Sequence, residues 1–233
     1  MYPNGKLKAI TLSFDDGVTQ DARLIELLDR YGLKCTFNLN SAIFGKPGRL
    51  TNSRGESADH NKVDPAIVAS LYKNHEVAVH TLTHPNLTTL PDEEIIRQVE
   101  EDRKNLTAIC GYEVIGMAYP CGGVNNDERV AALIQEHTPI RYSRTITSTH
   151  SFGLQKDKLL RFDPTLHFLD EKTEEIAEKF LALDTDEPQL LYIWGHSYEL
   201  DFDESRWTRF EKLCQTLSGK VDIFYGTNRE VLL

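Results

Sequence analysis

Residues 8–17 read "KAITLSFDDG", a mostly apolar run that ends in two acids and a glycine. The apolar positions of residues 8–14 are largely continuous, which is typical of a strand that is covered on both faces. Side chains that follow one another on a strand point to opposite faces, so Asp15 and Asp16 would normally diverge. Gly17 allows the chain to turn there, and both carboxylates can then face one site.

The same pattern of strand and helix recurs along the whole chain. Six further short runs predict strands over residues 34–39, 76–80, 114–119, 140–145, 190–195 and 222–227. Helical patterns lie between them, over residues 20–31, 65–73, 91–108, 125–137, 171–183 and 204–217. This alternation predicts a parallel α/β architecture, although periodicity alone does not separate an open sheet from a barrel.

The length and the composition indicate one globular domain. A chain of 233 residues suits a single domain over residues 1–233, and 40% hydrophobic with 27% charged residues allows a core of normal size. The longest irregular stretch is the Gly-, Ser- and Asn-rich segment 41–63. Loops of that length are usually functional or disordered, so we expect this one to shape a pocket.

The charge and the hydropathy exclude several classes of partner. The net charge is −10, which repels phosphate backbones and disfavours both nucleic acids and anionic membranes. No run approaches the ~20 apolar residues of a membrane span. The N-terminal "MYPNGKLKAITLSF" has no apolar signal-peptide core, so we expect a cytoplasmic protein unless a leader has been removed. The oligomeric state is left open.

The four cysteines, Cys35, Cys110, Cys121 and Cys214, form neither a zinc knuckle nor a recognisable disulfide framework. Cys35 and Cys214 lie in apolar patterns and are expected in the core. Cys121 is different, because it lies in "YPCGG" (119–123) at the end of a predicted strand.

Titratable residues gather at the ends of the predicted strands. In parallel α/β folds the pocket lies at the carboxyl ends of the strands, so these residues should meet. "HTLTH" (80–84) ends the third strand, and two histidines with one aspartate make a catalytic metal site that has open positions. Asp15 or Asp16 can complete it, and the other acid can act as a general base. The alternatives are two ordinary polar histidines and a surface turn.

The sixth strand ends in "WGHSYE" (194–199). A histidine at this place can protonate a leaving group, and the carboxylate of Glu199 can hold His196 in the required tautomer. The alternative is a buried histidine whose hydrogen bonds are satisfied.

Together these motifs resemble the polysaccharide deacetylases, carbohydrate esterase family four, in the family's order and over residues 8–230. "SFDDG" is similar to the family's TFDDG, which implies that Asp15 is the catalytic base and Asp16 a metal ligand. "HTLTH" is similar to H-[ST]-x-x-H and implies His80 and His84 as the other ligands. "IWGHSYE" resembles the last motif and implies His196 as the catalytic acid. The implied fold is an irregular (β/α) barrel of about seven parallel strands with helices outside.

The third motif departs from the family pattern. The family reads Arg-x-Pro-Tyr-Gly, whereas this chain reads Ala118-Tyr119-Pro120-Cys121-Gly122. The resemblance implies that the backbone N–H at the tyrosine position helps to hold the oxyanion, a role that passes to Cys121. We do not expect Cys121 to be a nucleophile, because no basic partner is near it in the sequence.

The arginine that tethers the base in the family is absent, and Arg144 is the predicted substitute, with Arg161 second. The family's Asp-Trp fourth motif is not recognisable either; "RFDPTLH" (161–167) stands at its place, where His167 either faces the pocket or has a structural role. Three further residues are expected to line the pocket, and two of them can stack on a sugar ring. They are Asn40, Trp194 and Tyr198, with core packing as the alternative for Trp194.

The sequence therefore predicts a metal-dependent hydrolase that removes acetyl groups, by N- or O-deacetylation, from an acetylated sugar or polysaccharide. The expected metal is Zn²⁺, with Co²⁺, Ni²⁺ or Mn²⁺ as alternatives. Three other functions remain open. They are an allantoinase-like or other small-amide hydrolase, a carbohydrate-binding protein of impaired catalysis, and an O-acetyl esterase on xylan-like chains.

Overall fold

The first strand of the chain lies inside the sheet and has partners on both of its edges. In the computed structural model, which describes residues 1–233, β1 (Lys8–Asp15) is buried along its whole length. β9 (Gln189–Gly195) pairs with one edge of β1. The other edge is shared, because β10 (Ile223–Tyr225) pairs with residues 8–10 and β2 (Cys35–Leu39) pairs with residues 12–15.

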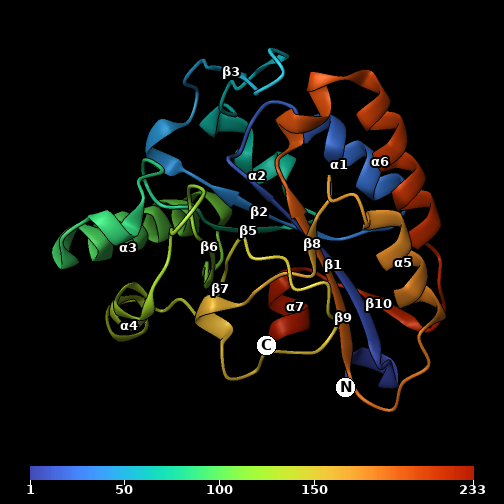
Figure 1. Cartoon of the computed structure of the whole chain (residues 1–233). Coiled ribbons are helices and arrows are strands. Elements are labelled where there is room, and N and C mark those ends of the chain that lie inside the picture. The colour runs from blue at the N-terminus through green and yellow to red at the C-terminus, as the bar shows by residue number, and fades with distance from the viewer.

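The remaining strands extend the sheet on both sides of this centre. Beyond β2 lie β5 (Glu76–Val79), β6 (Gly116–Ala118) and β7 (Tyr142–Arg144), and beyond β9 lies β8 (Leu166–His167). Every pairing in this sheet is parallel. The sheet curls into a partly closed barrel with helices outside (Figure 1). The predicted fold class is therefore confirmed, and all seven predicted strands are present, with β8 as an unpredicted addition.

Helices cover the outside of this sheet. They are α1 (Asp21–Arg30), α2 (Val68–Leu71), α3 (Asp92–Cys110), α4 (Glu128–His137), α5 (Thr173–Ala182), α6 (Glu204–Leu217) and α7 (Asn228–Leu232). In Figure 1, α1, α5 and α6 lie on one side of the molecule, and α3 and α4 lie on the other. Short 3₁₀ helices occupy Pro3–Gly5, Ser41–Ile43, Pro65–Ile67, Leu87–Thr89, Leu159–Arg161 and Ser197–Phe202. None of the helices has both the length and the apolar character that crossing a membrane requires.

The cysteines follow the sequence prediction. All four thiols are free, and Cys35 and Cys214 are buried in the main hydrophobic core. Cys214 belongs to the inward stripe of α6, which also contains Trp207, Phe210 and Leu217.

Three elements differ from the sequence prediction. Residues 65–73 hold a 3₁₀ turn followed by the four-residue α2 rather than one helix. α4 begins after Asp127, whose carboxylate accepts from the N–H of Val130 at 2.8 Å, whereas the amide of Asn125 donates to carbonyls of the preceding loop. α7 was not predicted, because its five residues are too few to show a helical period.

The segment 41–63 is an ordered hairpin rather than an irregular loop. β3 (Arg49–Thr51) pairs antiparallel with β4 (Ser57–Asp59), and each strand has only three residues, which is too few to show an apolar run. The chain after β4 then runs antiparallel to the turn after β1: Val18 is bridged to Lys62, and the N–H of Thr19 donates to the carbonyl of Asn61 at 2.9 Å. Figure 1 shows β3 at the end of the molecule opposite both termini.

Candidate active site

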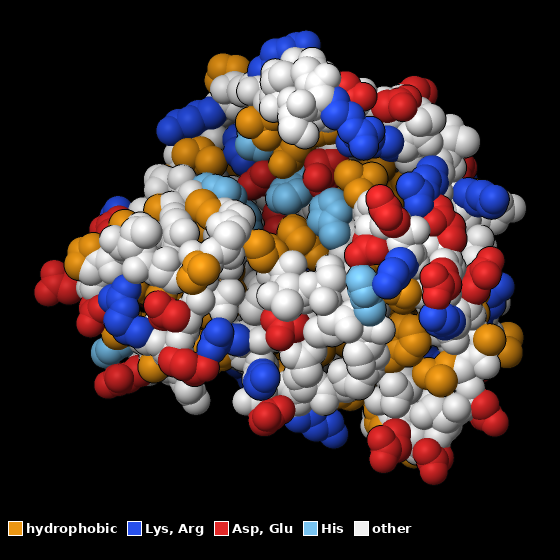
Figure 2. All heavy atoms as spheres, in the orientation of Figure 1, with side chains coloured by type: hydrophobic (Ala, Val, Ile, Leu, Met, Phe, Trp, Pro, Cys, Tyr) orange, Lys and Arg blue, Asp and Glu red, His pale blue; other side chains and the backbone are white.

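A pocket of about 540 Å³ lies at the carboxyl ends of the strands, as parallel α/β folds predict. Figure 2 shows it as a hollow with histidines and carboxylates at its base. Its walls come from five strand ends and from the hairpin segment. The polar and aromatic residues that line it include Asp15, Asp16, His60, Lys62, His80, His84, Tyr119, Cys121, Trp194, His196 and Tyr198.

The turn after β1 brings both aspartates to this pocket. Asp16 has a left-handed backbone with φ 84°, and Gly17 follows with φ 59°. A Cβ on Gly17 would lie 2.8 Å from Cδ2 of Leu39 and would strain a left-handed backbone, so the position favours glycine. Asp15 and Asp16 therefore both line the pocket, although they are neighbours in the chain.

Asp16, His80 and His84 form a group that can hold a metal ion. Oδ1 of Asp16 lies 3.4 Å from Nε2 of His84 and 3.8 Å from Nε2 of His80. This oxygen is buried and has no hydrogen-bond partner in the protein. Nδ1 of His80 lies 2.8 Å from the carbonyl of Ala118 and donates to it, which leaves Nε2 unprotonated for a ligand.

The protonation states suit a cation as well. Burial lowers the pKa of His80 to about 4 and also lowers the pKa of His84, so both rings are neutral near pH 7. Burial would raise the pKa of Asp16, but the hydrogen bond from His60 and the charge of Lys62 hold it well below its ordinary value. Two neutral imidazoles and one carboxylate are a donor set that Zn²⁺ accepts. The residues present therefore fit a divalent cation.

The histidine segment is held in place by Asn40 and Asp102. Nδ2 of Asn40 donates to the carbonyls of His80 and Thr81 at 2.5 and 2.9 Å, and Asp102 accepts from the backbone N–H of His80 at 3.2 Å. These contacts fix a strained chain, because Thr81 and His84 have φ of 69° and 63°. The prediction that Asn40 lines the pocket is wrong: its amide faces the backbone beneath the histidines, and it is absent from the pocket wall.

Asp15 is buried next to a fully buried arginine. Arg144, the last residue of β7, hydrogen-bonds to Oδ2 of Asp15, and Nδ2 of Asn38 donates to Oδ1 at 2.8 Å. Burial would raise the pKa of this carboxyl, but the charges of Arg144, His80 and His196 lower it below its ordinary value. The structure thus places Arg144 where the missing third-motif arginine was expected to act.

The neighbours of Arg144 explain how it is held and why Arg161 is not its equivalent. The guanidinium of Arg144 lies over the ring of Trp194, 4.4 Å from the centroid, and donates to the carbonyl of Thr145 at 2.8 Å. Arg161 instead pairs with Glu128 and donates to Asn126, away from Asp15. The second candidate for the tether is therefore wrong.

The altered third motif forms one wall of the pocket. Cys121 has φ 70°, and its Sγ lies 3.5 Å from the carbonyl of His84. Its backbone N–H donates no hydrogen bond within the protein. Partial burial raises the pKa of the Cys121 thiol, which disfavours a nucleophilic thiolate.

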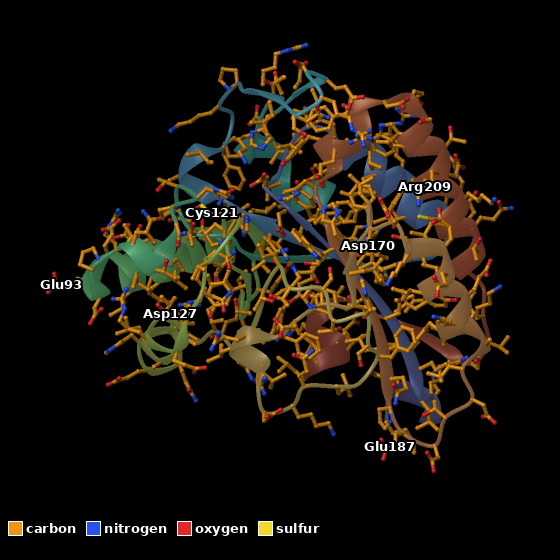
Figure 3. The ribbon with its side chains drawn as sticks, viewed as in Figure 1. Glu93, Cys121, Asp127, Asp170, Glu187 and Arg209 are labelled. Carbon is orange, nitrogen blue, oxygen red and sulfur yellow. The ribbon has the colours of Figure 1, made fainter.

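Tyr119 lines the pocket while its hydroxyl donates to the carbonyl of Leu160 at 2.7 Å, and Pro120 is buried outside the lining. Figure 3 labels Cys121 on the side of the molecule that carries α3.

His196 shares a carboxylate with a second histidine. Oε2 of Glu199 lies 3.1 Å from Nδ1 of His196 and 2.9 Å from Nε2 of His167. Burial alone would lower the pKa of His196, but the hydrogen bond and the charge of Glu199 outweigh burial and raise it to about 9. His196 therefore carries a proton at neutral pH, and its Nε2 is the nitrogen left for the pocket. His167 and Glu199 lie behind His196 and are not part of the pocket lining.

The aromatic residues predicted to stack on a sugar have different surroundings. One face of the Trp194 ring is covered by Arg144, so this ring supports the arginine. Tyr198 packs against His60 and His196, with ring centroids 4.9 and 5.1 Å apart, and lines the pocket. Sugar stacking on Tyr198 stays a prediction.

His60 and Lys62 are the two pocket residues that contact Asp16 although the sequence analysis did not single them out. His60 and Lys62 come from "SADHNK" (57–62) at the end of the hairpin, and both contact Asp16. The composition of the segment 41–63 suggested a functional loop, but nothing in its pattern indicated which of its residues reach the site.

Known proteins share this domain. The sequence model of the family described as "Polysaccharide deacetylase" matches residues 3–138, more than half of the chain. The peptidoglycan-N-acetylglucosamine deacetylase PgdA of Listeria monocytogenes is 28% identical over 121 residues, which are 51% of this chain and 22% of that protein. The peptidoglycan-N-acetylmuramic acid deacetylase PdaC of Bacillus subtilis is 27% identical over 125 residues, which are 52% of this chain and 23% of that protein. The match thus spans about a fifth of the length of these relatives.

Solved structures share the fold. A family 4 carbohydrate esterase of Streptomyces lividans, in complex with acetate, superposes with a TM-score of 0.60 at 16% identity, covering 95% of this chain and 93% of that one. BA3943 of Bacillus anthracis, described as a pseudoenzyme of the same family, also gives 0.60 at 18% identity, covering 100% of this chain and 67% of that one. On the strength of the sequence match over residues 3–138, the chain belongs to the polysaccharide deacetylase family.

Proposed function

We propose that this protein is a metal-dependent hydrolase that removes acetyl groups from an acetylated sugar or polysaccharide, with N-deacetylation as its main reaction. The observation that carries the proposal is the Asp16, His80 and His84 group with the ionised carboxylate of Asp15 beside it, at the base of one pocket. A divalent cation bound to the three ligands would polarise the acetyl carbonyl and make water more acidic.

Asp15 acts as the general base in this proposal. Its depressed pKa keeps it ionised at neutral pH, and Arg144 and Asn38 fix its two oxygens. Asp15 takes a proton from water while the water oxygen bonds to the acetyl carbon. The free backbone N–H of Cys121 donates to the oxygen that becomes negative.

His196 acts as the general acid. Its proton passes to the departing nitrogen as the carbon–nitrogen bond breaks, and the products are acetate and an amine. Glu199 accepts from Nδ1, so the ring keeps one orientation and presents Nε2 to the pocket. The opposite protonation states of Asp15 and His196 near pH 7 match a base and an acid that work together.

The relation to a pseudoenzyme supports one further candidate, a carbohydrate-binding protein of impaired catalysis. BA3943 shares the fold and is described as a pseudoenzyme of the same family. This chain keeps a carboxylate base, three ligands and a histidine acid in one pocket, and Arg144 fills the place of the missing arginine. These residues favour the enzyme. The single-domain organisation and the cytoplasmic location stay predictions.

Acetate release tests the proposal. The purified protein is incubated with N-acetylglucosamine oligomers, acetylated xylan, small acetamido-sugars and allantoin, with and without a chelator. We expect acetate from at least one N-acetylated sugar, loss of this activity with the chelator, and its return when Zn²⁺ or Co²⁺ is added. Sugar binding without acetate release would favour the binding protein, and turnover of allantoin alone would favour the ureide hydrolase.

A further inference from the structure

The segment that follows β4 is fixed against the turn after β1 by regular backbone pairing. The N–H of Val63 donates to the carbonyl of Gly17 at 2.9 Å, the N–H of Thr19 donates to the carbonyl of Asn61 at 2.9 Å, and Lys62 is bridged to Val18. The amide of Gln20 adds a bond to the carbonyl of Asp59 at 2.7 Å. The segment 59–63 therefore lies antiparallel beside the Asp15–Asp16 turn, joined to it by an isolated β-bridge and by the hydrogen bonds around it.

This pairing aims two side chains at one residue. Side chains two positions apart on an extended chain point to the same side, so His60 and Lys62 face the turn together. Nε2 of His60 lies 3.0 Å from Oδ2 of Asp16. Nζ of Lys62 donates to the backbone carbonyl of Asp16 at 2.7 Å and lies 3.5 Å from its Oδ1.

The two contacts act on different parts of Asp16. Lys62 donates to the main-chain carbonyl of Asp16. The φ of Asp16 is 84°, a backbone conformation that is unfavourable for every residue except glycine. His60 occupies Oδ2 and so turns Oδ1, the oxygen without a partner, toward His80 and His84. The ring of Tyr198 packs edge to face against His60, with centroids 4.9 Å apart, and limits its rotation.

We propose that His60 is a positioning residue for the metal site: by donating to Oδ2 of Asp16 it holds Oδ1 in the direction of the cation. This inference rests on the proposed metal site and adds to it a partner from outside the barrel. Groups that orient a metal ligand typically change the affinity for the metal by about 10- to 100-fold.

The test measures metal binding directly. The metal-free full chain is titrated with Zn²⁺ in competition with a chromophoric chelator, and Co²⁺ absorption spectra report the geometry of the site. We expect His60→Ala to bind Zn²⁺ about 10- to 100-fold more weakly than the original protein. His60→Gln should recover most of the affinity, because its amide can donate from nearly the same place as Nε2.

His150→Ala is the matched control. Nε2 of His150 lies 2.7 Å from Oδ2 of Asp170, a histidine–aspartate pair outside the pocket lining, so this variant should bind Zn²⁺ as the original protein does. Unchanged affinity in His60→Ala would overturn the inference. Complete loss of binding, equal to that of Asp16→Ala, would also overturn it, because His60 would then be a ligand itself. If the original protein binds no Zn²⁺, the proposed metal site fails first, and the two failures are thereby distinguished.

Discussion

Arg144 hydrogen-bonds to Asp15 although three strands separate their own strands in the sheet. Arg144 ends β7 and Asp15 ends β1, with β6, β5 and β2 between them. A flat sheet would hold these strand ends far apart, because neighbouring strands lie about 4.8 Å from each other. The curl of the sheet brings the two charges together across the inside of the barrel, where both are buried.

Replacement of Arg144 by alanine should damage both stability and turnover. The change leaves the Asp15 carboxylate buried without its cation, which costs about 3–5 kcal/mol of the free energy of unfolding. Since Asp15 also loses its orientation, we expect acetate release to fall by roughly 100-fold or more. Urea unfolding and initial rates measure the two effects. Arg161→Ala is the matched control and should change little, and an Arg144→Ala variant as active as the original would refute the tether.

Asp15 and His80 should respond differently to replacement, because only His80 is a proposed metal ligand. Asp15→Asn keeps all three metal ligands, so we expect Zn²⁺ binding near the original affinity and turnover reduced by roughly 100-fold or more. His80→Ala removes a ligand and should lose both binding and turnover. Zinc content after dialysis and initial rates are the measurements. A fully active Asp15→Asn would show that another group takes the proton from water.

Glu199→Gln should make the protein lose its activity at a lower pH on the basic side of its pH–rate profile. The acid must be protonated, so turnover falls as the pH rises through the pKa of His196, which is about 9. Burial lowers the pKa of His196 and Glu199 is the group that raises it most, so loss of the carboxylate charge moves the pKa down. We expect the basic limb of the pH–rate profile to shift downward by roughly one to two units.

The matched control for this change is Glu174→Gln. Glu174 pairs with Arg209, labelled in Figure 3, and lines no part of the candidate site, so its profile should stay in place. An unmoved basic limb in Glu199→Gln would mean that His196 is not the acid that limits turnover at high pH.

Asn40→Ala should lower the affinity of the proposed metal site, because Asn40 holds the backbone of the histidine segment. The change leaves the carbonyls of His80 and Thr81 without the donor that they share, at a cost of about 1–3 kcal/mol in the free energy of unfolding. It also releases the turn that sets the direction of His80, so Zn²⁺ affinity should fall. Thermal unfolding and zinc titration check this. Asn74→Ala, at an exposed asparagine that donates to Asp29, should affect neither.

The sequence was sufficient to predict seven of the eight strands of the main sheet and the residues at their carboxyl ends. Apolar runs and the acids or histidines after them are local features, and parallel pairing brings their carboxyl ends to one place. Arg144 could be suggested as the partner of Asp15 because it lies in a predicted strand near its carboxyl end. Only the curl of the sheet shows that Arg144, and not Arg161, reaches Asp15. The role of Asn40 depends on which way a buried amide turns, and that is decided by neighbouring carbonyls rather than by its position after β2.

His60 and Lys62 were outside the reach of sequence reasoning for a related reason. Their segment has no apolar period, and its conformation is set by backbone bonds to Gly17 and Thr19, about 40 positions earlier in the chain. Such contacts leave no pattern in the segment itself. The apolar run that reveals a strand of the main sheet is absent, because β3 and β4 have three residues each and all of β3 is exposed.

The left-handed backbone of the site has an evolutionary consequence. Of the six non-glycine residues with positive φ, four lie at the site, namely Asp16, Thr81, His84 and Cys121. Each such residue costs about 1–3 kcal/mol, and the barrel must supply the stability that holds them. Selection for a more stable chain would therefore favour glycine at these four positions. Selection for the proposed hydrolysis would oppose glycine at Asp16, His84 and Cys121, because these residues are metal ligands in the proposal or line the pocket. A descendant released from catalysis should lose these side chains early, while its sheet persists.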